Sequence, residues 1–185
     1  IENADNNTLG AYQIESVDES VTAASATALT TAIDALNAAA ADYTVKGFFG
    51  TKTASVDAGA TARDTAAAFN LVSSTTGIKA TAITKARLAA SAAATFTFTL
   101  TGKSSTASTV TATITATTDL TALKDAINSV SGSTGIVATL TSDKAGINVT
   151  QDEGYNIIIN DVTTGSTTAN ITVKAMERDG TVDST

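Results

Sequence analysis

Residues 70–81, NLVSSTTGIKAT, are repeated with few changes at residues 128–139, NSVSGSTGIVAT. The two stretches align without a gap, which indicates one supersecondary unit used twice. In each copy an amphipathic segment ends in a Ser/Thr/Gly turn, after which apolar and polar residues alternate. The sequence therefore predicts a helix end, a turn and the start of a strand, with Val72/Val130 and Ile78/Ile136 facing inward. The identical pairs are Asn70/Asn128, Val72/Val130, Ser73/Ser131, Thr76/Thr134, Gly77/Gly135, Ile78/Ile136, Ala80/Ala138 and Thr81/Thr139.

A hairpin pattern precedes each copy. Residues 43–58 read as a hairpin with its turn between Gly47 and Lys52, and Thr61 with Asp64 has the spacing of a capping box. The second hairpin is clearer, because TFTFTL (95–100) and TVTATITA (109–116) alternate strictly around a link of turn-forming residues.

Strand patterns follow each predicted helix. The second helix begins near Thr118 or Asp119 and places its apolar residues on one face. Each unit thus reads as hairpin, helix, strand, strand, and the helix is expected to cover a small antiparallel sheet. The apolar residues of the second helix are Leu120, Leu123, Ile127 and Val130. The strands expected after the helices lie at 77–82, 86–91, 135–140, 147–149 and 155–159.

These patterns predict an α+β fold of small antiparallel sheets, each covered by a short helix, in two repeated β-β-α-β-β units. Outside the units we expect a strand at 10–17, an amphipathic helix at 22–42 and a returning strand at 171–176. The predicted domains are residues 1–91, to which 163–185 could return, and residues 92–162.

The absence of two chemically reactive residue types, cysteine and histidine, reduces the number of functions that are possible. The chain has no Cys and no His, which removes thiol nucleophiles, the usual triad base and the commonest metal ligands. Its net charge is −7, without a basic run for nucleic acid or an anionic membrane. No apolar run is long enough to span a bilayer. We expect no enzyme and no cofactor. Since the chain begins at Ile1 without a signal peptide, we also expect a fragment of a larger protein.

Several polar groups are candidates for sites. Asp152, Glu153 and Asp161 could bind calcium through carboxylate oxygens, but Asp-Glu-Gly is also a good turn and no calcium-loop spacing is present. Lys85 and Arg87 could form a site with Asp64, but ordinary surface ion pairs, which are common and weak, explain such residues better. We therefore predict no catalytic, cofactor-binding or metal-binding residue.

Two further motifs concern phosphate and sugars. Gly47–Gly50 lacks the pattern of a phosphate-binding loop. The abundant Thr fits an exposed sheet face and also O-linked glycans. Asn6, Asn148 and Asn170 stand in glycosylation-type sequons, which arise by chance in so Thr-rich a chain.

The repeated units resemble the repeat of the variable central region of bacterial flagellins, which is also found in some hook-associated and filament-cap proteins. The resemblance is carried by the run Asn-x-Val-Ser-x-x-Thr-Gly-Ile-x-Ala-Thr in both copies and by the order of elements around it. TKARL (84–88) and GAYQI (10–14) are similar to flagellins in particular. The long heptad-like helices through which flagellins polymerise have no counterpart in this sequence.

The resemblance implies the outer domains of a flagellin, exposed on the extracellular filament used for swimming. In that family these domains influence antigenicity, adhesion and bundling, and other flagellin subunits are the partners. A fragment of a hook-associated or cap protein is the neighbouring alternative. A surface adhesin is another, although the chain has few aromatic side chains on which sugars could stack. As an inserted region, the chain should have residues 10 and 176 close together.

Overall fold

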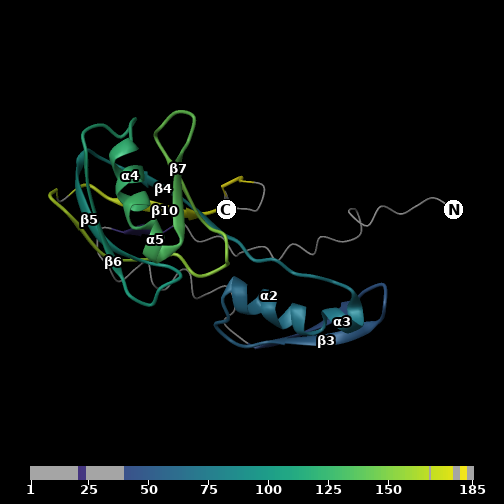
Figure 1. The fold of residues 1–185 in the computed structure, drawn as a ribbon. Helices are drawn as coiled ribbons and strands as arrows, with labels where there is room; N and C mark the ends of the chain where they lie inside the picture. The colour runs from purple at the N-terminus through teal and green to yellow at the C-terminus, as the bar shows by residue number, and fades with distance from the viewer. Residues whose placement is uncertain (1–20, 24–39, 167, 177–179, 183–185) are drawn as a thin grey trace.

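The computed structural model describes residues 21–23, 40–166, 168–176 and 180–182 (Figure 1). These residues form two antiparallel sheets that share a core, and a separate hairpin covered by a helix. The α+β prediction is therefore confirmed. The larger sheet has the order β1-β10-β4-β8-β7, and its strands are β1 (Val21–Ala23), β10 (Ile171–Ala175), β4 (Thr84–Ala90), β8 (Ile147–Gln151) and β7 (Ile136–Leu140). The smaller sheet has the order β6-β5-β9, with β6 (Ser108–Ile114), β5 (Ala94–Thr101) and β9 (Ile158–Thr164).

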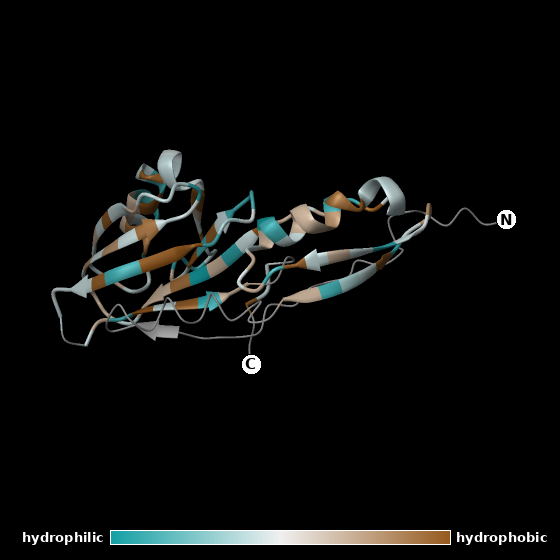
Figure 2. Ribbon diagram, turned by 90° about the horizontal axis from the view of Figure 1, so that it is seen from below, coloured by the Kyte–Doolittle hydropathy of each residue, from teal (hydrophilic) through white to brown (hydrophobic). Residues whose placement is uncertain are grey.

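The two sheets pack as a sandwich because each presents one apolar face. On β5, Phe96, Phe98 and Leu100 are buried and alternate with threonines, as the sequence predicts. Figure 2 shows this alternation as bands of brown and paler colour along the strands. Leu88 of β4 and Ile147 of β8 enter the same core from the other sheet. A thin core of aliphatic residues around two phenylalanines thus holds the sheets together.

Helix α4 (Thr121–Ser129) closes one side of the sandwich and continues into the short helix α5 (Ser131–Thr134). It packs against β6 of one sheet and β7 of the other, and both are edge strands. Leu123 and Ile127 of the helix and Leu120, which directly precedes it, are buried on the predicted face. A helix placed there shields two sheet edges that would otherwise be open to pairing with another chain.

The smaller body is the first unit's hairpin with its helix. Its strands β2 (Ala41–Lys46) and β3 (Thr51–Val56) confirm the predicted turn, and helices α2 (Ala62–Leu71) and α3 (Ser73–Thr76) follow. Figure 2 shows α2 lying along the hairpin. The predicted capping box is present: the hydroxyl of Thr61 accepts the N–H of Asp64, whose carboxylate accepts the N–H of Thr61. Its own core is small and consists of Val45, Ala54, Val72 and the partly buried Phe69.

Three details differ from the sequence predictions. No strand starts at Gly77, because residues 78–83 are irregular and the next strand is β4. The predicted helix 22–42 is wrong at both ends, where β1 and β2 occur, and its centre lies outside the described residues. The hairpin and the two later strands of the second unit lie in different sheets of the sandwich. The predicted strand 10–17 also lies outside the described residues.

The larger sheet crosses the predicted domain boundary near residue 91, because β4 pairs with β8 on one side and β10 on the other. The returning strand is present as β10. Of the helices in the described part of the chain, none is long and apolar enough to cross a membrane.

Candidate functional site

The repeated stretch forms the same helix end and glycine turn in both copies, and we call it the elbow (residues 70–81 and 128–139). A helix ends at a glycine in the left-handed region, with φ of 76° at Gly77 and 67° at Gly135. The N–H of each glycine donates to a serine carbonyl, from Gly77 to Ser73 and from Gly135 to Ser131, at 2.7 Å in both. Glycine is needed here because a Cβ disfavours this backbone conformation.

A buried threonine stabilises each elbow. The side chains of Thr76 and Thr134 are fully buried. Each hydroxyl donates to the carbonyl of the valine four residues earlier, at 3.0 Å, and accepts the N–H of the isoleucine two residues later. Donor and acceptor capacity are therefore both used, as burial of a hydroxyl requires.

An asparagine joins the helix end to the chain that leaves the elbow. The amide of Asn128 donates to the carbonyl of Ala138 at 2.9 Å and accepts its N–H at 2.8 Å. Asn70 makes the same two bonds with Ala80, both at 2.9 Å. An asparagine can make this two-way contact with one peptide because its amide is both donor and acceptor.

The two elbows lead into different surroundings. In the second copy Ile136 is fully buried and begins β7. In the first copy Ile78 is 36% exposed, so the prediction that it faces inward is wrong. Val72 is buried as predicted, and Val130 is partly buried against the core. The first copy lacks a second sheet for Ile78 to cover, since its hairpin has two strands and its core is small.

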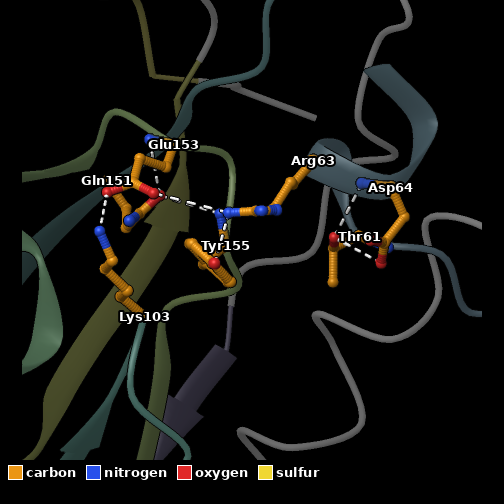
Figure 3. A network of polar contacts seen from close by, with 7 residues as sticks. All are labelled: Thr61, Arg63, Asp64, Lys103, Gln151, Glu153 and Tyr155. Carbon is orange, nitrogen blue, oxygen red and sulfur yellow. Dashed lines mark hydrogen bonds and ion pairs between the residues drawn. The ribbon is translucent and has the colours of Figure 1, made fainter. Parts of the chain in front are cut away.

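A polar network joins the smaller body to the sandwich (Figure 3). The N–H of Arg63, at the start of α2, donates to the carbonyl of Gly154 at 3.0 Å. The Arg63 guanidinium lies over the ring of Tyr155 and donates to its hydroxyl. Glu153 pairs with Arg63 at 3.5 Å and with Lys103 at 2.6 Å. We call this network the joint.

The turn that contacts Arg63, residues 152–154, is held in place by hydrogen bonds to the side chain of Gln151. Gln151 is 1% exposed, and its Oε1 accepts the N–H groups of Glu153 and Tyr155, both at 2.9 Å. Gly154 has φ of 75°, and a Cβ there would lie 2.3 Å from the Cβ of Ala82. The joint therefore depends on a close backbone approach that only glycine permits.

Threonines cover the outer face of the smaller sheet. Thr95 and Thr113 are directly opposite on β5 and β6, with their hydroxyls 2.9 Å apart, and Thr97 and Thr111 are 3.1 Å apart. Such cross-strand pairs stabilise a sheet modestly while leaving hydroxyls at the surface.

The structure places the carboxylates of the candidate calcium site in separate roles. Glu153 belongs to the joint, and Asp161 accepts the hydroxyl of Thr99 at 3.1 Å. Asp161 has a positive φ of 54° at the irregularity where β9 pairs with β5. Among the residues that the structure describes, no group of three Asp or Glu side chains could hold a metal ion.

The other candidate groups have structural partners. Arg87 donates to the amide oxygen of Asn148 across β4 and β8, at 2.9 Å. Asp64 serves in the capping box. Asn170 pairs with Ser91 through its backbone, and Asn6 lies outside the described residues.

In the part of the chain that the structure describes, three exposed groups have shifted pKa values. Hydrogen bonding and attraction to Glu153 raise the pKa of Lys103 above its ordinary 10.5. The pKa of Asp119 is lowered by hydrogen bonds from the hydroxyl and N–H of Thr121, the first residue of α4, whose N-cap position is occupied by Leu120. The pKa of Asp143 is lowered by the hydroxyl of Thr141 and the N–H of Ala145. All three shifts arise from turn or joint contacts.

Sequence reasoning missed the joint. The turn at 152–154 was predicted, but its partner Arg63 lies 92 residues from Tyr155, and no periodicity marks such a contact. Gln151 was also missed, because it occupies an apolar position of an alternating strand pattern. A polar residue at that position was the signal, since a buried amide must find hydrogen-bond partners.

An arrangement of small sheets and joining turns defines a structural module. Comparison with protein families adds that residues 95–153 match the flagellin hook IN motif. This range contains the second hairpin, α4, the second elbow and β8. The match supports a flagellin-type structural protein, a class that assembles with other flagellin subunits in the extracellular filament. No curated protein matches the chain.

Proposed function

We propose that this chain is the surface-exposed outer region of a bacterial flagellin and decorates the filament used for swimming. The observation that carries the proposal is the match of residues 95–153 to the flagellin hook IN motif. The first elbow supports it, because residues 70–81 repeat the same hydrogen bonds outside the matched range.

The pairing of the first and last strands of the described residues supports an inserted region. β1 and β10 are antiparallel neighbours, with Val21 opposite Val173. An insertion between two polymerising helices must leave close to where it enters, and adjacent terminal strands satisfy this need. The related prediction for residues 10 and 176 stays a prediction, since residue 10 is outside the described part of the chain.

In this role the chain provides the outer surface of the filament and catalyses no reaction. The threonine face of β5 and β6 is what other cells, antibodies and neighbouring filaments would meet, and it offers hydroxyls to which O-linked glycans could be attached. Antigenicity, adhesion and bundling would then depend on this surface. Within this proposal residues 1–91 and 92–162 are the two outer regions of the sequence, joined by the pairing of β4 with β8, and 163–185 is the returning segment.

A hybrid flagellin that carries this chain in place of its own outer region tests the proposal. Residues 1–185 would replace the outer region of a flagellin that assembles, in a strain without its own flagellin. We expect swimming cells whose filaments are labelled along their whole length by antibodies raised against the chain. The proposal is overturned if the purified chain folds by circular dichroism but the hybrid forms no filament, or forms filaments that these antibodies do not reach.

The same insert distinguishes the alternative. Placed in a filament-cap protein, it should not improve filament growth over a cap protein without an insert. Growth that is restored in the cap protein and absent in the flagellin would favour a hook-associated or cap origin.

A further inference from the structure

The end of the β2–β3 hairpin exposes two aromatic side chains. Phe48 is 94% exposed and Phe49 is 74% exposed, and their rings pack against each other edge to face at 5.3 Å. The chain has five phenylalanines, and Phe96 and Phe98 are fully buried. Two exposed phenylalanines at one turn are therefore not used for folding, and such an apolar patch marks an interaction surface.

Positive charge surrounds these rings. Lys46 and Lys52 flank the turn, and Lys79 follows the first elbow glycine, Gly77, which Phe49 approaches. All three lysines are exposed, and none forms an ion pair with another described residue. No acidic residue occurs in 43–56 or 72–82. We call this basic, aromatic end the tip (Lys46–Lys52 with Lys79).

A groove with the opposite charge begins at the other end of the same body. It lies between the end of β3 and α2, has a volume of about 420 Å³ and adjoins a smaller hollow beside Asp42. Alanines of the β3–α2 link and of α2 line it together with Leu71, whose side chain is 84% exposed. We call it the base groove, and its principal residues are Asp42, Val56, Asp57, Ala58, Asp64 and Leu71.

We propose that the tip of one copy of this chain docks in the base groove of the next copy. The tip brings two phenylalanines and three lysines, and the groove with its adjoining hollow offers alanine and leucine side chains beside three aspartates. Opposite charges at the rim orient the contact, while burial of the phenylalanines supplies its main favourable free energy. The contact is a property of the chain itself and stands apart from the proposed filament role.

The geometry makes the contact head-to-tail. In the hairpin, Lys46 pairs with Thr51 at the tip and Ala41 pairs with Val56 at the base. Six residues of strand separate the two ends by roughly 17–20 Å. One copy therefore cannot fill its own groove, and a contact between unlike surfaces repeats from copy to copy.

Cross-linking tests this inference, because the chain has no cysteine of its own. One preparation carries Thr51→Cys at the tip and another carries Ala58→Cys in the groove. A short bis-maleimide should join the mixed preparations into a heterodimer. The control replaces the groove variant by Thr113→Cys on the outer face of β6, and it should give only background cross-linking.

Two sets of variants identify the forces. Phe48→Ser with Phe49→Ser in the tip chain should lower cross-linking about tenfold or more, because the main apolar contact is lost. Lys52→Glu in the tip chain should lower the yield of cross-linked heterodimer. Asp42→Lys in the groove chain should restore that yield, because it returns opposite charges to the two surfaces. Equal cross-linking with Ala58→Cys and Thr113→Cys, or no effect of the Phe changes, overturns the inference. Phe-dependent binding to phosphatidylserine vesicles without cross-linking at Ala58→Cys also overturns it, by assigning the tip to a lipid surface.

Discussion

The guanidinium of Arg63 lies over the ring of Tyr155, with its central carbon 4.5 Å from the ring centroid. These residues come from the two parts of the fold, one from the start of α2 and the other from the turn after β8. Their contact, with the ion pairs of Glu153, defines how the smaller body meets the sandwich.

Replacing Arg63 should loosen the joint without unfolding the sandwich. Arg63→Ala removes a cation–π contact of about 0.5–1 kcal/mol at an exposed position. We expect a small change in the unfolding midpoint and a wider range of orientations between the two parts, measured by residual dipolar couplings. Arg63→Lys keeps the charge and loses the flat stacking surface, so it should fall between Ala and the unchanged chain. A large drop in stability with Arg63→Lys would contradict this view of the joint.

Gly154→Ala should be much more harmful than its matched control, Gly59→Ala. Both glycines have positive φ values, 75° and 71°, but a Cβ at Gly59 meets nothing within 4 Å. The control should therefore cost only the backbone strain of about 1–2 kcal/mol. At Gly154 the clash with Ala82 and with the backbone of Arg63 adds to that strain. Urea unfolding measures both, and equal losses would show that the close approach is unimportant.

The asparagines of the two elbows should differ in their contribution to stability. Asn128→Ala leaves the N–H and carbonyl of Ala138 without their partner at a partly buried position, at a cost of about 1–3 kcal/mol. Asn70→Ala should cost less, because water replaces the lost bonds at an exposed position.

Asn128→Asp provides the control for this pair. The carboxylate still accepts the N–H of Ala138 but cannot donate to its carbonyl, so an intermediate loss is expected in urea unfolding. Equal losses for Asn70→Ala and Asn128→Ala would contradict the difference in burial.

The chain should lose stability in acid partly through Asp119 and Asp143. Both have pKa values below their ordinary 3.8 in the folded state, so the unfolded chain binds protons first as the pH falls. Their contribution is present above about pH 3.8 and is lost as the pH falls below it, towards the lower folded-state values. Thermal unfolding between neutral and strongly acidic pH should therefore show a fall that Asp119→Asn and Asp143→Asn make shallower. An unchanged slope in both variants would exclude these contacts as its cause.

The features of this fold that could be predicted from the sequence are those set by residues close together in the chain. The hairpin 95–116, the capping box at Thr61 and the face of α4 were predicted because they rest on neighbouring residues. The pairing of β4 with β8 and β10 was not, since all three strands alternate in the same way and the sequence does not state which edges meet.

The first elbow shows a second reason why structure could not be predicted from the sequence alone. Residues 78–82 carry the strand pattern of the second copy, yet they remain irregular because the chain around them provides no sheet for Ile78 to cover. The tip was partly visible in the sequence as Phe48 and Phe49 between lysines, but their exposure could be known only from the fold. The same is true of Arg63, whose partners come from distant turns.

The pairing of β1 with β10 has a mechanical consequence. Both chain exits leave from the same end of this antiparallel pair, as Val21 opposite Val173 requires. A force that pulls the start of β1 away from the end of β10 therefore acts across the strands and breaks their hydrogen bonds one after another. Such a geometry resists little force at the attachment, while the sandwich behind it stays intact. In the proposed filament role, the module would yield first at this strand pair in moving liquid, and re-pairing of the three residues of β1 would restore it.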